Sequence, residues 1–264
     1  MTETNFALSK DGTKLGYDVL GSGPPLVIVN GALAVRNFVF AKRMAEAFAK
    51  HFTVYNYDRR GRNDSGDTKP YTVAKEVDDV AAICKVAGGK PYVVGFSSGA
   101  ALALEAAASG VAMAGLFAYE PPYTRADPSD KTDASFQTTL DELVAKDDRS
   151  GAVSYFMRTV GVPAFGVAVM KLLPMWKTMK ATAHTLPYDA RIMAGFEVPA
   201  ARLAKVKVPT VLSYGTKTAP RLRMAAEAAH KAVPESRLVP VPKANHAGAP
   251  KLLVPVVVAV FRAP

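Results

Sequence analysis

The chain of 264 residues has few of the features that define disulfide-rich, membrane-spanning or metal-binding proteins. It contains one cysteine, Cys84, which excludes a disulfide scaffold. Its longest apolar run, Leu252–Phe261, is interrupted by Pro255 and has ten residues, whereas a membrane-spanning helix needs about 20. Because the sequence has no H-E-x-x-H, no C-x-x-C and no phosphate-loop or dinucleotide glycine spacing, we expect neither a metal nor a cofactor.

Acidic residues are scarce in the last quarter of the chain. The formal net charge is +10, and residues 201–264 hold 11 Lys and Arg against two acidic residues, Glu227 and Glu235. A nucleic-acid surface usually interleaves basic residues with aromatic ones, but Tyr214 and Phe261 are the only aromatics here. We therefore expect a solvated basic face and no nucleic-acid partner.

The first residues lack both a basic leader and the apolar stretch of a signal peptide. With no candidate membrane span and little cysteine, the sequence predicts a reduced, cytoplasmic setting.

Short apolar runs that are typical of buried strands alternate with segments that have helical spacing. The expected strands are residues 26–29, 52–57, 91–96, 111–119, 210–214 and 237–241, and the expected helices are residues 36–50, 73–86, 99–108 and 221–233. Residues 5–9 and 15–20 flank a turn and predict a hairpin. This alternation predicts an α/β fold with a mostly parallel sheet and helices on both faces.

The alternation stops at Pro121-Pro122, and residues 121–204 show helical patterns with no convincing strand. We interpret this segment as a helical lid inserted into a core made of residues 1–120 and 205–264. It holds five of the nine methionines and the only tryptophan. These side chains are either ordinary core or a soft lining for an apolar substrate. We expect Leu33, Phe156, Met175 and Trp176 to line the substrate pocket.

One sequence motif indicates a catalytic residue. Gly95-Phe96-Ser97-Ser98-Gly99 has the pattern G-x-S-x-G and lies between an expected strand and an expected helix. A serine on such a sharp turn projects from the sheet, and glycines two positions away on either side avoid clashes in the turn. The N–H groups at the start of the helix face the negative charge that develops when a carbonyl is attacked. The pattern predicts that Ser97 is a nucleophile.

Together with two other segments, this motif resembles the α/β-hydrolase superfamily over most of the chain. Val27-Ile28-Val29-Asn30-Gly31-Ala32 looks like the family's strand and oxyanion loop, with Asn30 in place of the usual histidine. Residues 57–65 resemble the family's Y-D-x-R-G-x-G-x-S turn, with Asn63 where glycine is usual. The resemblance implies oxyanion donors at the backbone N–H groups of Ser98 and of Ala32 or its neighbour. Asp58 and Arg60, in the second segment, are expected to be structural.

A serine nucleophile needs a base, and the chain has four histidines. His51 precedes an expected strand, His184 lies in the expected lid, and His230 lies in a helical pattern. Only His246 follows the last expected strand on a glycine-containing loop, where the resemblance places the catalytic histidine.

A catalytic triad also needs an acid beside Ser97 and His246, and here the sequence departs from the commonest family pattern. The loop after residues 210–214 usually ends in an aspartate, but Thr218 occupies that position and no carboxylate lies between Glu197 and Glu227. Glu120 ends the preceding expected strand, and some members of the superfamily, similar to lactone hydrolases of the zearalenone-opening type, take their acid from that strand. We expect Glu120 to orient His246, the alternative being a capping residue or a partner of Arg125.

The sequence therefore predicts a cofactor-free serine hydrolase that cleaves an apolar, small-molecule carboxylic ester or lactone through an acyl-enzyme. Two alternatives remain open: a C–C bond hydrolase of the same fold, and a non-catalytic ligand-binding protein of that fold, which the threonine at position 218 favours.

Overall fold

The computed structural model describes residues 4–130, 132 and 134–262, and a single eight-stranded sheet runs through these ranges. The strand order is β1-β2-β4-β3-β5-β6-β7-β8. The strands are β1 (Asn5–Leu8), β2 (Lys14–Leu20), β3 (Pro25–Val29), β4 (Thr53–Tyr57), β5 (Tyr92–Phe96), β6 (Gly115–Tyr119), β7 (Thr210–Gly215) and β8 (Arg237–Val241).

Strands β3 to β8 pair in parallel, while the hairpin of β1 and β2 adds two antiparallel pairings at one edge. The predicted mostly parallel α/β fold is confirmed. From β3 the chain moves to β4 on one side and returns to β5 on the other. The carboxyl ends of β3 and β5 therefore flank the switch point where ligands bind in open α/β sheets.

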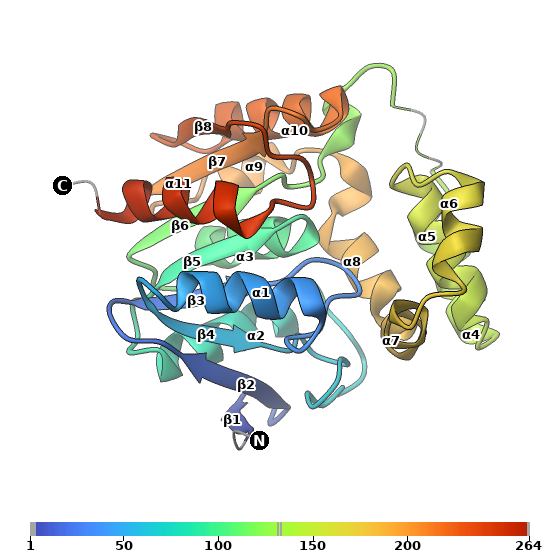
Figure 1. Ribbon diagram of the computed structural model, residues 1–264, viewed down its shortest axis with the longest axis horizontal. Helices are drawn as coiled ribbons and strands as arrows, with labels where there is room; N and C mark the ends of the chain where they lie inside the picture. Colours follow the sequence, from blue (N-terminus) through green and yellow to red (C-terminus); the bar gives the residue numbers. More distant parts are fainter. Residues whose placement is uncertain (1–3, 131, 133, 263–264) are drawn as a thin grey trace.

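Helices cover both faces of the sheet (Figure 1). On one face, α1 (Val39–Phe48) packs beside α11 (Pro250–Arg262). On the other face lie α2 (Val73–Val86), α3 (Ser98–Ala108), α9 (Ala200–Leu203) and α10 (Pro220–Ala232).

The valine-rich last segment is a helix, although its β-branched residues have only modest helix propensity. Leu253, Val254, Val257 and Phe261 recur at helical spacing and are buried against the sheet. Tertiary packing of this apolar face decides the conformation of the segment.

Residues 121–204, called here the helical segment, connect β6 to β7. Its α-helices before α9 are α4 (Phe136–Ala145), α5 (Arg149–Thr159), α6 (Ala164–Met170), α7 (Met175–Thr182) and α8 (Leu186–Ile192). Helices α4 to α7 gather beside one end of the sheet, and α8 leads back to it (Figure 1). Apolar side chains of these helices form a cluster separate from the two that cover the sheet. None of the helices in the described ranges has both the length and the hydropathy that a membrane span needs.

Candidate active site

Ser97 occupies a sharp turn between β5 and α3. Its φ of 53° and ψ of −123° are rarely adopted by residues with a side chain. A Cβ added to Gly95 would lie 2.6 Å from Ala100 Cα, and one added to Gly99 would lie 2.2 Å from the carbonyl oxygen of Val29. Only glycine fits at these two positions, which explains their spacing around Ser97.

His246 and Glu120 meet at the carboxyl end of the sheet. The Nδ1 atom of His246 lies 2.5 Å from Oε2 of Glu120. Glu120 directly follows β6 and is fully buried, whereas the side chain of His246 is 47% exposed on the loop after β8. A buried carboxylate on Nδ1 fixes the orientation of the ring and leaves Nε2 free to accept a proton.

Two donors from β7 and its loop hold the Glu120 carboxylate. The backbone N–H of Gly215 donates to Oε1 at 2.8 Å, and the Thr218 hydroxyl donates to Oε2 at 3.1 Å. The residue at the usual aspartate position therefore supports the carboxylate of the neighbouring strand. The sequence alternative that paired Glu120 with Arg125 is wrong, because Arg125 donates to the carbonyl oxygens of Gly195 and Thr132.

The loop that carries His246 is fixed to the sheet by neighbouring groups. Tyr119 donates its hydroxyl to the carbonyl oxygen of Asn245 at 2.7 Å. The backbone N–H of Lys217 donates to the carbonyl oxygen of Ala244 at 2.8 Å. Burial and the adjacent Glu120 carboxylate raise the pKa of Tyr119 above its ordinary value, so the phenol remains a donor.

The loop after β3 passes close to Ser97. A Cβ on Gly31 would lie 3.2 Å from Ser97 Cβ, so the backbone before Ala32 approaches the serine. Asn30 is buried and donates to Asn56 Oδ1 of β4 at 2.9 Å, which ties the start of this loop to the sheet. Ser98 is the first residue of α3, and its N–H is one of the helix-start groups that no intrahelical carbonyl accepts.

The other three histidines have different surroundings. His230 Nδ1 lies 2.8 Å from the Ser236 hydroxyl, and His184 Nε2 lies 3.9 Å from Asp67. His51 uses its carbonyl oxygen to accept from Arg262. Across the part of the chain that the structure describes, no group of three or more His, Cys, Asp or Glu could hold a metal ion.

The four residues predicted to line the pocket belong to one apolar cluster. Leu33, Phe156 and Trp176 are buried in it, and Met175 packs against it half-buried. Leu33 comes from the loop after β3, while the others come from the helical segment. The structure thus joins an apolar surface of the helical segment to the loop beside Ser97.

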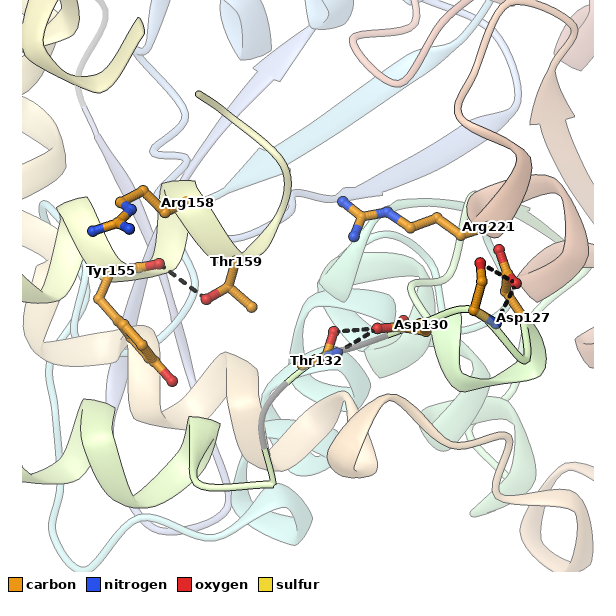
Figure 2. A pocket seen from close by; sticks show the side chains of 8 residues that line it. Asp127, Asp130, Thr132, Tyr155, Arg158, Thr159 and Arg221 are labelled. Atoms are coloured by element: carbon orange, nitrogen blue, oxygen red, sulfur yellow. Dashed lines mark hydrogen bonds between the residues drawn. The ribbon is translucent and has the colours of Figure 1, made fainter. Parts of the chain in front are cut away.

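A polar cavity of about 610 Å³ opens between α5, the chain after β6 and Arg221 of α10 (Figure 2). Its acidic groups are bonded within their own turns, since Asp127 accepts from Ser129 and Asp130 accepts from Thr132. Arg221 donates to the carbonyl oxygen of Val160 at 2.6 Å. The lining is chemically unlike the apolar pocket that the sequence predicts.

The turn after β4 is held by buried ion pairs. Asp58 accepts from the backbone N–H of Arg36 at 2.7 Å, and Arg60 makes a bidentate pair with Asp79 at 2.6 and 2.7 Å. Asn63 adopts a φ of 44°, which explains how asparagine replaces the usual glycine. These contacts agree with a structural role for Asp58 and Arg60.

A buried group around Asp189 of the helical segment was not predicted from the sequence. Arg59 and Arg62 donate to this carboxylate, and so does the Ser98 hydroxyl. Three arginines within four residues, in the turn after β4, were the available signal. No local pattern identifies their partner more than 120 residues away.

Comparisons with known proteins agree with this architecture. Residues 26–256 match the model of the alpha/beta hydrolase family. A crystal structure of an alpha/beta hydrolase from Sphaerobacter thermophilus is 44% identical, covers 97% of this chain and 100% of that one, and superposes with a TM-score of 0.90. The chain therefore belongs to the α/β hydrolase family, as its resemblance to that superfamily implied.

Two further matches say less about this chain. An esterase from Exiguobacterium antarcticum has 17% identity over 99% of this chain and 100% of that one, with a TM-score of 0.71, and shows the fold alone. The uncharacterized hydrolase YraK of Bacillus subtilis is 34% identical over 109 residues. That match spans 40% of each of the two chains.

Proposed function

We propose that the protein is a serine hydrolase that cleaves a carboxylic ester or lactone without a cofactor. The contact that carries this proposal is the one between His246 Nδ1 and the buried Glu120 carboxylate. The strained turn at Ser97 adds the nucleophile, and the three residues follow the family order of nucleophile, acid and base.

In the proposed mechanism Ser97 Oγ attacks the substrate carbonyl while His246 takes its proton. The backbone N–H groups of Ser98 and Ala32 stabilise the oxyanion that forms. His246 then protonates the leaving oxygen, and the acyl group remains on Ser97. A water molecule, deprotonated by His246, hydrolyses the acyl-enzyme. Glu120 keeps the ring in the required tautomer throughout.

The helical segment supplies the proposed substrate pocket. We assign residues 1–120 and 205–264 to a catalytic core and residues 121–204 to a lid. Leu33 packs in one apolar cluster with Phe156, Trp176 and Met175 of the helical segment, and we propose that the substrate binds against this cluster. Such a lining favours an apolar small-molecule substrate over a charged one, because a charged group would lose its hydration there without a partner.

The test is turnover of an activated ester, p-nitrophenyl acetate, by Ser97→Ala. Removing the nucleophile of such a triad lowers kcat by at least about 10⁴-fold. Ser109→Ala, an exposed serine at the end of α3, is the control and should keep wild-type turnover. Undiminished turnover by Ser97→Ala would reject the mechanism. Parallel assays with a β-diketone separate ester cleavage from C–C cleavage, since only a C–C hydrolase would prefer the diketone.

A further inference from the structure

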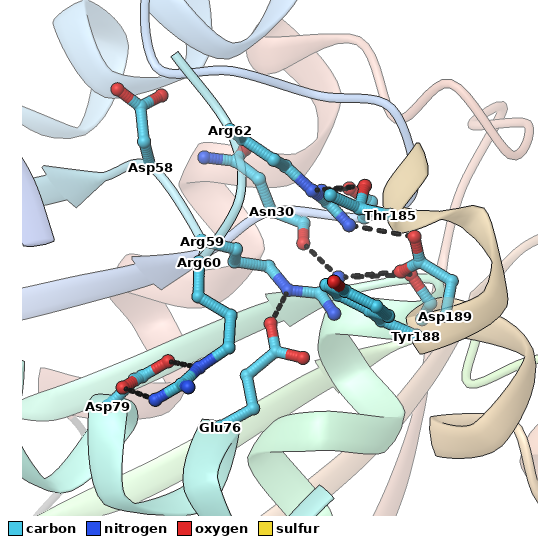
Figure 3. Close-up of polar contacts among 12 residues, drawn as sticks. Asn30, Asp58, Arg59, Arg60, Arg62, Glu76, Asp79, Thr185, Tyr188 and Asp189 are labelled. Atoms are coloured by element: carbon cyan, nitrogen blue, oxygen red, sulfur yellow. Dashed lines mark hydrogen bonds and ion pairs between the residues drawn. The ribbon is translucent and has the colours of Figure 1, made fainter. Parts of the chain in front are cut away.

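Four charged side chains form a buried group between the core and the helical segment (Figure 3). Arg59 and Arg62 follow β4, Glu76 lies in α2, and Asp189 lies in α8. Each of the four is at most 1% exposed. Two positive and two negative charges balance, which allows them to remain ionised away from water.

Asp189 is the centre of this group. Its Oδ1 accepts from Arg59 Nη1 and from the Ser98 hydroxyl, each at 2.7 Å, and its Oδ2 accepts from Arg62 Nη2 at 2.7 Å. Burial opposes ionisation, but the guanidinium groups of Arg62 and Arg59 outweigh it and hold the pKa of Asp189 below its ordinary range. The carboxylate therefore acts as a charged acceptor for three donors.

The same arginines reach the loop after β3. Arg62 Nη1 donates to the carbonyl oxygen of Gly31 at 2.7 Å and to that of Ala34 at 3.2 Å. Arg59 Nη1 donates to the carbonyl oxygen of Asn30 at 3.3 Å. These carbonyls lie on both sides of Ala32. One carboxylate from the helical segment is thus connected to both chain segments that carry the proposed oxyanion donors.

We propose that Asp189 is a positioning residue that fixes the N–H groups of Ser98 and Ala32 relative to each other. The inference rests on the proposed function. Oxyanion stabilisation depends on donors held about 2.7–3.1 Å from the developing charge, so a small displacement of either donor weakens it. Asp189 holds one donor through the Ser98 hydroxyl and the other through Arg62 and the loop after β3. Full activity therefore requires that α8 packs correctly against the core.

The neighbouring pair of Arg60 and Asp79 provides a matched control. Asp79 is also buried and also receives two guanidinium hydrogen bonds, from the residue next to Arg59. The remaining bonds of Arg60 go to Asp11 and to the carbonyl oxygen of Lys75, away from the ends of β3 and β5. Replacing Asp79 disturbs a buried ion pair of the same kind without touching the oxyanion segments.

The experiment compares Asp189→Asn with Asp79→Asn at a temperature where thermal unfolding shows both to be folded. The readouts are kcat and KM for p-nitrophenyl acetate and the inhibition constant of a trifluoromethyl ketone, whose hemiketal presents an oxyanion. For Asp189→Asn we expect kcat to fall about 10- to 100-fold with KM within about threefold, and inhibitor affinity to fall by a similar factor to kcat. For Asp79→Asn we expect a lower Tm with kcat and inhibitor affinity within about twofold of wild type.

Ser98→Ala keeps the backbone N–H and removes only the hydroxyl that bonds Asp189, so it decides the question if Asp189→Asn does not fold. We expect kcat to fall about three- to tenfold, with a matching loss of inhibitor affinity. Wild-type kcat and inhibitor affinity in Ser98→Ala and in any folded Asp189→Asn would overturn the inference, as would an equal loss in Asp79→Asn. Either result, combined with inactivity of Ser97→Ala, would leave the proposed function standing. Undiminished turnover by Ser97→Ala would reject both.

Discussion

The ends of β6 and β7 lie side by side in the sheet, yet they carry different chemistry. Tyr119 of β6 pairs with Ser213 of β7, and the residue that follows Tyr119 is Glu120. The loop after β7 places Thr218 where an aspartate is usual in the family, and the hydroxyl of that threonine donates to Glu120 at 3.1 Å. The two strand ends form one acid site whose charge comes from β6 and whose hydrogen-bond donors come from β7.

Removing the carboxylate from β6 is the largest expected perturbation of this arrangement. In Glu120→Gln the amide cannot stabilise the imidazolium of His246, so kcat for p-nitrophenyl acetate should fall about 10³- to 10⁴-fold. Glu105→Gln is the control: it removes a buried carboxylate of α3 that pairs with Arg202 of α9, and it should keep wild-type kcat. A Glu120→Gln enzyme with wild-type kcat would mean that the acid comes from another residue.

Moving the carboxylate to the loop after β7 tests whether either strand end can supply the acid that contacts His246. Thr218 Oγ1 lies 3.1 Å from the Glu120 oxygen that contacts His246, so an aspartate at position 218 can reach the same ring. The double variant Glu120→Gln, Thr218→Asp should regain about 10- to 100-fold of the kcat that Glu120→Gln loses. Kinetics of the single and double variants under one set of conditions give this factor. No recovery would show that only the end of β6 presents a carboxylate to His246 correctly.

The smallest expected effect belongs to the Thr218 hydroxyl on the loop after β7. Thr218→Val keeps the shape of the side chain and removes one neutral donor to Glu120, whose other oxygen still accepts from Gly215. We expect kcat to fall about two- to tenfold with KM unchanged, because one hydrogen bond to a charged group is lost. A change in KM alone would instead place Thr218 against the substrate.

The sequence predicts the fold well because its local signals agree with the packing. The apolar strands alternate with helices, and Gly95 and Gly99 stand where no Cβ fits. Glu120 could be proposed as the acid because it lies at a strand end and because Thr218, which is not an acid, occupies the usual aspartate position. The contacts of Glu120 with Gly215 and Thr218 were beyond prediction, because they depend on the register between β6 and β7.

Two other features could not be derived from sequence patterns. The last helix contains Val257 and neighbouring valines, and packing on the sheet outweighs their modest helix propensity. The contact between Arg59 and Asp189 joins residues 130 positions apart. The two charged residues come from separate parts of the fold. Their pairing therefore produces no local periodicity in the sequence.

Whether Ser97 is the nucleophile can be tested by reaction of the wild-type protein with a fluorophosphonate, followed by intact-mass measurement and peptide mapping. We expect one label per chain, located on Ser97 and prevented by prior occupation of the site with the trifluoromethyl ketone. Folded protein that hydrolyses p-nitrophenyl acetate but takes no label on Ser97, or that takes it on another residue, would contradict the assignment of Ser97 as the nucleophile.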